Sequence, residues 1–200
     1  MVSIVGWASI GIGLAVLTLS VVGAVGPTIP AAEARAFRAV NGLPDGLFWP
    51  LWVPMQLGNL VVGAAAGLLA ALALGDLRVA VAVVAAVVLK LGVERLLRHR
   101  MEPHLTVRQR PGTSQPGAHL RGRDVPAVGP SFPSGHVILV ASVACVVGDV
   151  LSGWWLVGCF AVPLCVMVGR VYVGAHNPLD VTAGLGAGLV VGGLLAVLLG

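Results

Sequence analysis

The chain has 200 residues, of which 58% are hydrophobic and only 10% are charged. The mean hydropathy is +0.98, whereas soluble domains carry roughly 25% charged residues, so the composition excludes an ordinary soluble protein. Its length predicts a single domain spanning residues 1–200. The net charge is +4, and eight of the twelve Lys and Arg residues lie between Lys90 and Arg123. Such a cluster could bind nucleic acid, anionic lipid or a phosphate substrate, but the chain has no recognisable nucleic-acid-binding module.

Six apolar stretches are long enough, or nearly so, to cross a bilayer, which takes about 17–25 residues. The first has no charged residue before Glu33, so we expect an uncleaved span and not a signal peptide. The sequence therefore predicts an all-α polytopic membrane protein with about six transmembrane helices in one bundle. The predicted spans are approximately residues 4–26, 57–75, 77–97, 136–152, 153–170 and 179–199.

Residues 27–56 form the first predicted segment outside the spans. Five prolines interrupt it, which prevents a long helix, and its tryptophans suit a membrane–water interface. We expect a short amphipathic helix near residues 31–40 lying against the membrane, followed by an irregular re-entry. This helix is either a lipid anchor or a lid for a lipid substrate.

Span parity assigns the loops to the two ends of the bundle. With six spans, loops 27–56, 98–135 and 171–178 share one membrane face, and the tight turns near residues 75–78 and 149–153 share the other with both termini. The positive-inside rule would place the arginine-rich loop in the cytoplasm. Arginines that bind a phosphate would weaken that rule, so charge alone does not orient the protein.

Pro133-Ser134-Gly135-His136 opens the fourth predicted span. Ser134 is a good N-cap residue, and the free backbone N–H groups of Gly135 and His136 would form an anion site at the helix N-terminus. His136 would stand beside the bound anion and could donate a proton. An ordinary capped helix start would show the same residues.

Arg170, His176 and Asp180 surround the start of the sixth predicted span. Asn177 is a plausible N-cap and Pro178 fits the first helical position, so the Asp180 carboxylate would point back along the chain, towards His176. A carboxylate on one imidazole nitrogen leaves the other available as a nucleophile or base. The alternative is a helix cap beside a surface histidine, although Arg170 needs a partner and a guanidinium suits phosphate oxygens.

Lys90 stands in an otherwise apolar run. It could extend to the interface, pair with Glu94 one turn later, or point into a site. The three cysteines lie in apolar spans without a Cys-x-x-Cys motif, so they indicate neither a zinc site nor a redox pair. We expect no metal and no cofactor.

Together, the three blocks resemble the type 2 phosphatidic acid phosphatase (PAP2) superfamily. Its pattern is Lys-x6-Arg-Pro, then Pro-Ser-Gly-His, then Ser-Arg-x5-His-x3-Asp. The second block matches fully, and the third matches except that Gly169 replaces the serine. In the first block, Arg98 stands one residue late and lacks the proline, whereas Arg110 keeps its proline but lies further on; we prefer Arg110. The resemblance covers about residues 57–198.

The resemblance implies a six-helix membrane fold and a metal-independent phosphatase with its site on the extracytoplasmic face of the cell membrane. His176 would attack phosphorus and form a phosphohistidine, Asp180 would orient it, and His136 would protonate the leaving oxygen. The groups that would hold the phosphoryl oxygens are Lys90, Arg110 (or Arg98), Ser134, Gly135 and Arg170.

The expected substrate is a lipid phosphate whose tail stays among the membrane lipids. Polyprenyl diphosphate, phosphatidate and phosphatidylglycerol phosphate all fit, and nothing in the sequence separates them. A lipid phosphotransferase would need the same residues. A non-catalytic lipid-phosphate binder or transporter would need Lys90 and Arg170 but not His176. Vanadate-dependent haloperoxidases have related motifs but are soluble. The sequence does not fix the oligomeric state.

Overall fold

The computed structural model describes residues 3–26, 28–101, 108–123 and 125–199, with the backbone alone for residues 98, 100 and 101. Within these ranges the secondary structure is helical, apart from an isolated β-bridge between Gln109 and Pro130. The α-helices are α1 (Ile4–Ala24), α2 (Ala31–Asn41), α3 (Phe48–Met55), α4 (Leu60–Leu74), α5 (Leu77–Met101), α6 (Pro111–Ser114), α7 (Gly135–Gly148), α8 (Gly153–Tyr172) and α9 (Pro178–Leu199), and the 3₁₀ turns are Asp45–Leu47 and Gln56–Gly58.

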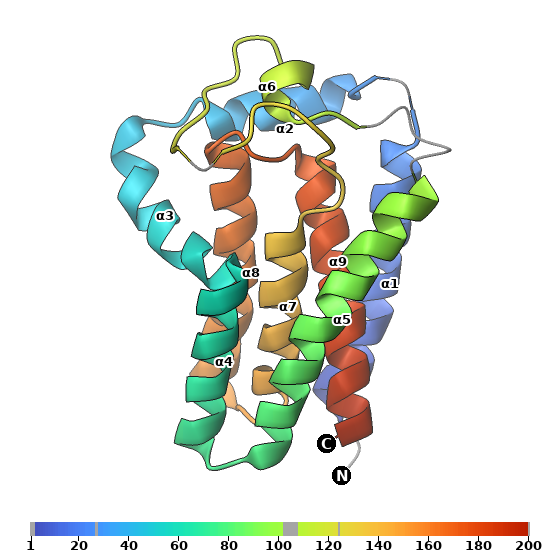
Figure 1. Cartoon of the computed structure of the whole chain (residues 1–200), viewed down its shortest axis with the longest axis vertical. Coiled ribbons are helices and arrows are strands. Elements are labelled where there is room, and N and C mark those ends of the chain that lie inside the picture. The colour runs from blue at the N-terminus through green and yellow to red at the C-terminus, as the bar shows by residue number, and fades with distance from the viewer. Residues whose placement is uncertain (1–2, 27, 102–107, 124, 200) are drawn as a thin grey trace.

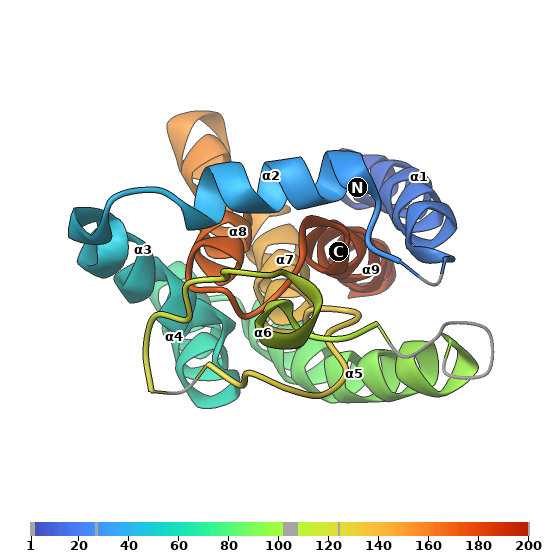
Figure 2. The same cartoon turned by 90° about the horizontal axis from the view of Figure 1, so that it is seen from above.

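Helix α7 is the centre of the bundle. Helices α1, α4, α5, α8 and α9 run along the same long axis (Figure 1), and the view from above places α7 among α4, α5, α8 and α9 (Figure 2). Every residue of α7 except His136 and Val143 is buried. The buried residues lie around the whole circumference of α7, so neighbouring helices pack against it on all sides.

Glycines allow α9 to approach α7 closely, as their four-residue spacing in the sequence indicates. Gly184, Gly188 and Gly192 all face α7. A Cβ atom would lie 2.7 Å from a carbonyl oxygen of α7 or its N-cap at Gly184, and 2.6 Å from one at Gly188. Real Cβ atoms essentially never come within 3.0 Å of another heavy atom, so side chains at these positions would force the two helices apart.

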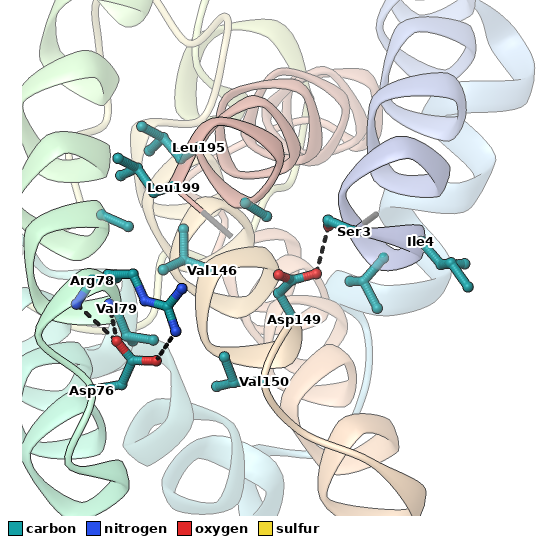
Figure 3. Close-up of a pocket in the computed structure, with 13 residues that line it drawn as sticks. Ser3, Ile4, Asp76, Arg78, Val79, Val146, Asp149, Val150, Leu195 and Leu199 are labelled. Carbon is teal, nitrogen blue, oxygen red and sulfur yellow. Dashed lines mark hydrogen bonds and ion pairs between the residues drawn. The ribbon is translucent and has the colours of Figure 1, made fainter. Parts of the chain in front are cut away.

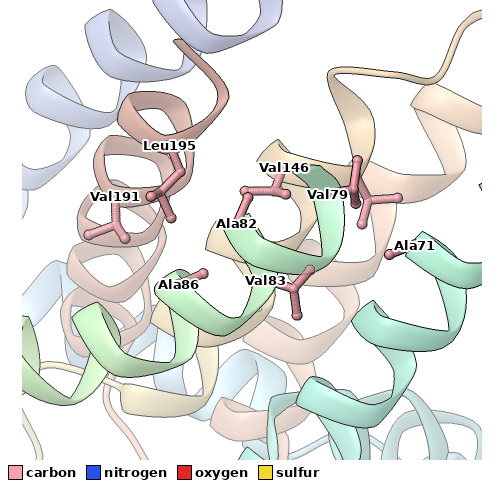
Figure 4. Close-up of a cluster of buried hydrophobic side chains, with 9 residues drawn as sticks. Ala71, Val79, Ala82, Val83, Ala86, Val146, Val191 and Leu195 are labelled. Carbon is pink, nitrogen blue, oxygen red and sulfur yellow. The ribbon is translucent and has the colours of Figure 1, made fainter. Parts of the chain in front are cut away.

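An apolar cluster joins α4, α5, α7 and α9 (Figure 4). Lipid tails are as apolar as these side chains, so in a membrane the cluster stabilises the bundle through close packing and not through exclusion of water. Its buried members are Ala71, Val79, Ala82, Val83, Ala86, Val146, Val147, Val191 and Leu195.

Local signals set the boundaries of the α4–α5 hairpin. The Asn59 side chain accepts hydrogen bonds from Val61 N and Val62 N at the start of α4, and Gly75 ends it with a φ of 65°. Asp76 then caps α5 by accepting from Arg78 N at 2.8 Å, and its backbone hydrogen bonds hold the pKa of this carboxyl below its ordinary value. The tight turn expected here is confirmed.

Three helices, α1, α8 and α9, are long and apolar enough to cross a membrane, and the bent α3–α4 segment gives up to four. The count of six predicted spans is therefore not confirmed among the described residues. Helix α4 has only 15 residues and meets the preceding segment at 77°, and α7 has only 14. Helix α5 has 25 residues, but Lys90, Glu94 and Arg95 interrupt its apolar character.

The amphipathic helix expected near residues 31–40 is confirmed as α2, which lies across one end of the bundle (Figures 1 and 2). Glu33, Phe37 and Asn41, spaced four residues apart, form its buried face, while Arg35 and Arg38 are exposed. The loop carrying α6 lies at the same end. Both chain ends, with the α4–α5 and α7–α8 turns, lie at the opposite end (Figure 1), as span parity requires.

Candidate active site

The three chemical blocks come together at the end of the bundle that α2 covers. Lys90, Arg110, Arg170 and His176 all lie near enough to act electrostatically on His136. The second and third blocks are also joined directly, because Ser134 N donates to the Asp180 carbonyl at 3.0 Å. Residues separated by up to 90 positions in the sequence thus share one site.

Ser134 occupies the N-cap position of α7 in an extended conformation, but its hydroxyl does not cap the helix. The predicted N-cap position of Ser134 is therefore confirmed, although the side chain makes no capping hydrogen bond. The side chain is fully buried, and Oγ has no hydrogen-bond partner within the described part of the chain. Burying an unpaired hydroxyl costs about 1–3 kcal/mol, and a ligand that accepts from Oγ would relieve this cost.

His176 and Asp180 lie side by side, both buried, as their spacing predicts. Asp180 Oδ2 accepts from Asn177 N at 2.8 Å, which is the expected return of the carboxylate along the chain. However, Oδ2 lies 3.8 Å from His176 Nδ1, too far for a hydrogen bond. The atom that lies within hydrogen-bonding distance of Nδ1 is the Ser131 carbonyl oxygen, at 2.9 Å.

This arrangement selects one tautomer of His176. A carbonyl oxygen only accepts, so Nδ1 must carry the proton and donate it to Ser131 O, which leaves Nε2 with its lone pair. Burial lowers the pKa of His176, outweighing Asp180, which raises it, and Arg170 and Arg110 lower it further. The imidazole is therefore neutral at pH 7, the state that a nucleophile requires.

The cations of the site differ in how they are held. Arg170 lies in the last turn of α8, and its Nε atom is buried without a hydrogen-bond partner among the described residues. Arg110 Nη1 donates to the Ala175 carbonyl at 2.9 Å, next to His176. Lys90 Nζ pairs with Glu94 at 2.7 Å, which is one of the alternatives that the sequence left open.

Gly135 and Gly58 make room for the groups around the start of α7. A Cβ atom on Gly135 would collide with the Glu94 carboxylate, and one on Gly58 would lie 2.7 Å from the Cβ of His136. Glycine at position 135 therefore lets charged groups reach the backbone closely.

Sequence reasoning missed two contributors. The Ser131 carbonyl is a backbone group, which no side-chain pattern marks. Arg108 is buried and binds Asp180 Oδ1 through Nε at 2.7 Å. In Arg108-Gln109-Arg110-Pro111, the proline marks Arg110, and not Arg108, as the arginine of the first block. The alternative candidate Arg98 lies in α5, but its side chain is outside the described part of the structure.

Cavities open at both ends of the molecule. One of about 550 Å³ lies beside α2 and α6, and Arg38, Arg108 and Gln109 contribute to its lining. Another of about 570 Å³ lies at the opposite end, near Ser3, Asp76 and Asp149 (Figure 3). The predicted catalytic and phosphate-binding residues do not line this second cavity, so its position gives it no part in their chemistry.

A site with several cations at the start of two helices suits the binding of a phosphate group. The chain belongs to the PAP2 superfamily, whose family model matches residues 64–199. It is therefore a member of a superfamily of membrane lipid phosphatases, which hydrolyse phosphoric monoesters or diphosphates.

Two solved structures have similar folds. LpxE of Aquifex aeolicus is 19% identical, with a TM-score of 0.64 over 84% of this chain and 95% of that one. The transmembrane PAP2-type phosphatidylglycerolphosphate phosphatase of Bacillus subtilis is 18% identical, with a TM-score of 0.69 over 92% and 93%. At these identities the likeness shows the fold alone. No curated protein is significantly similar in sequence.

Proposed function

We propose that this protein is a metal-independent phosphatase of lipid phosphates or diphosphates that works through a phosphohistidine on His176. The observation that carries the proposal is a pair of buried donors, Ser134 Oγ and Arg170 Nε, which have no hydrogen-bond partner among the described residues and lie near a histidine whose Nε2 is unprotonated. Donors of this kind are satisfied by the oxygens of a phosphoryl group. Both belong to the blocks that the sequence marks as phosphate-binding.

The reaction would proceed in two displacements. His176 Nε2 attacks phosphorus, the bond from phosphorus to the lipid oxygen breaks, and His136 gives that oxygen a proton. Water then attacks phosphorus, His136 takes its proton, the bond from phosphorus to His176 Nε2 breaks, and phosphate leaves. Lys90, Arg110, Arg170, Ser134 and the Gly135 amide would stabilise the charge on the phosphoryl oxygens, which is the main requirement of phosphoryl transfer.

The proton-donating role of His136 depends on the substrate. A bound phosphate dianion beside the imidazole would favour its protonated form, so His136 would be ready to protonate the leaving group once substrate occupies the site among Lys90, Arg110 and Arg170.

The membrane arrangement is also a proposal. We infer a single domain that crosses the membrane six times through α1, α3–α4, α5, α7, α8 and α9, with the site on the extracytoplasmic face of the cell membrane. The short α7 would span with protein around it, since it is central and buried. A single cysteine at the exposed Thr113, in a background without the native cysteines, should react with an impermeant maleimide on intact cells. Labelling only after lysis would reverse the orientation.

The substrate candidates remain polyprenyl diphosphate, phosphatidate and phosphatidylglycerol phosphate, and the last is what the Bacillus subtilis protein of similar fold is described as hydrolysing. We propose that the substrate is one of these lipid phosphates, with its acyl or prenyl tail in the membrane and its phosphate headgroup in the site. Release of inorganic phosphate from each lipid in detergent, without an added acceptor, identifies the substrate. It also separates a hydrolase from a phosphotransferase.

His176→Ala tests the nucleophile. The variant should lose at least about a thousandfold in rate, while its thermal unfolding and its binding of vanadate are retained. His119→Ala is the matched control, because His119 is exposed and its ring nitrogen contacts Arg121 instead of the proposed machinery. Retention of more than a tenth of the activity by His176→Ala would remove the phosphohistidine from the mechanism.

A further inference from the structure

Arg108 connects two carboxylates that lie far apart in the sequence. Its Nε donates to Asp180 Oδ1 at 2.7 Å, and its Nη2 donates to Glu33 Oε1. The exposed fraction of the side chain is 4% for Arg108, 4% for Glu33 and 0% for Asp180. The three groups therefore form a buried ion-pair network from α2 through the loop before α6 to the first turn of α9.

A contribution to folding stability is a weak explanation for this ion-pair network. Removing three charges from water costs several kcal/mol for each ion, and well-packed apolar residues often replace buried ion pairs without loss of stability. The ion-pair network does fix the orientation of the Asp180 carboxylate. Arg108 holds Oδ1 of Asp180 and Asn177 N holds Oδ2, so the carboxylate cannot turn away from His176 Nδ1.

The net charge of the ion-pair network also suits the proposed chemistry. Two carboxylates and one guanidinium sum to a net charge of −1. When His176 Nε2 bonds to phosphorus while Nδ1 keeps its proton, the ring gains one positive charge. That charge would then face a fixed group of opposite sign among buried side chains, where electrostatic stabilisation is stronger than in water.

We propose that Arg108 is a positioning residue of the phosphatase site, which acts on His176 through Asp180, and that Glu33 anchors it. This inference rests on the proposed phosphohistidine mechanism. Glu33 Oε1 also accepts from Leu179 N at 2.9 Å, so the same carboxylate attaches α2 to the first turn of α9. Helix α2 is thus held over the site by the group that steadies Arg108.

A kinetic double-mutant cycle tests the proposal. Arg108→Met should lower kcat by about 10- to 100-fold, the range for outer-shell partners that orient a reacting side chain, with KM changed little. Asp180→Asn removes the group through which Arg108 acts. In an Asp180→Asn background, Arg108→Met should therefore cost less than about threefold, because residues that act as one unit are not additive. Additive losses would overturn the proposal.

A pH profile supplies a readout that a purely structural role would not change. The charged and titratable groups facing His176 are Asp180, Arg170, Arg110 and His136. Without Arg108, the Asp180 charge is no longer balanced and favours a proton on the His176–Asp180 pair. The acid limb of kcat/KM should therefore move to higher pH in Arg108→Met and stay in place in Arg108→Lys. An unmoved limb in Arg108→Met would contradict the proposal.

Arg121 offers a matched control in the same loop. Its guanidinium donates to the carbonyls of Asn41, Leu43 and Tyr172 and lies over the Tyr172 ring. Arg121→Met should lower thermal stability without shifting the acid limb or coupling to Asp180→Asn. Should Arg108→Met fail to fold, Arg108→Lys replaces it in the cycle, because a point charge cannot span both carboxylates and coupling to Asp180 is still expected. If His176→Ala is inactive while the double-mutant cycle is additive, the role proposed for Arg108 is refuted and the phosphohistidine mechanism is retained.

Discussion

The choice between Arg110 and Arg98 as the second cation of the first block can be decided by substitution. Arg110→Ala should change the side chain alone, because its backbone contacts remain: Arg110 N donates to Gly129 O, and Arg110 O accepts from Thr113 N and Ser114 N at the start of α6. The side chain donates a charge-assisted hydrogen bond from Nη1 to Ala175 O at 2.9 Å. It also acts electrostatically on His136, Arg170 and His176.

These two contributions are detected by different measurements. Loss of a hydrogen bond with a charged donor costs about 1.5–3 kcal/mol of folding stability, which thermal unfolding detects. Loss of a cation that stabilises the transferring phosphoryl group costs about 2.7–4 kcal/mol, or roughly 100- to 1,000-fold. We therefore expect Arg110→Ala to lose at least 100-fold in kcat/KM, with partial recovery in Arg110→Lys, which keeps the charge but not the planar fork.

Arg98 provides the comparison, because it lies one turn before α5 ends at Met101. The run Arg98-His99-Arg100 is typical of a helix end at the membrane interface, where an arginine contributes well under 1 kcal/mol, so we expect Arg98→Ala to lose less than about fivefold. The assay is phosphate release from one lipid phosphate in detergent, with both variants checked for thermal unfolding. A larger loss at Arg98 than at Arg110 would show that the motif is merely stretched by one residue.

Three further predictions follow from the same site. Asp180→Asn should slow phosphate release strongly but less than His176→Ala, because it removes charge and orientation and leaves the attacking atom; an unchanged rate would reduce Asp180 to a helix cap. Because the pKa of His176 is lowered, the midpoint of its titration, followed by NMR, should lie below the ordinary value of about 6.5, with His176→Ala used to assign the resonance; a midpoint at or above 6.5 would refute the electrostatic argument. Activity should survive EDTA, because Lys and Arg supply the positive charge on the phosphoryl group; loss on chelation and recovery with Mg²⁺ would contradict this.

Much of the fold was predictable because the apolar runs and their breaks are local signals. The expected turn at residues 75–78 formed around Gly75 and Asp76, whose roles as helix end and helix cap depend only on neighbouring residues. The number of spans was not predictable in the same way. The bend of 77° before α4 shortens that helix, and such a bend depends on packing against α7 and α8.

The site was predictable in its reacting side chains and not in their support. Spacing brought His176 and Asp180 together, but the partner of His176 Nδ1 is a backbone carbonyl 45 residues away. The burial of Glu33 had a usable signal, since it shares a four-residue stripe with Phe37 and Asn41 on α2. Its pairing with Arg108, 75 residues distant, depends on how the loop folds over the bundle, and sequence pattern does not reach that far.

The polarity of the helices explains why an anion site forms at this end of the bundle. Helices α7 and α9 both begin there, with His136 and Asp180 in their first turns, so two positive helix ends point towards the phosphate position. Helices α5 and α8 run the opposite way, and their negative ends would oppose an anion. Arg170 lies in the last turn of α8, where a cation counters that end, and Lys90, in the second half of α5, adds its charge to the site directly. The positive potential of the site thus comes from the starts of α7 and α9 together with the cations Lys90, Arg110 and Arg170.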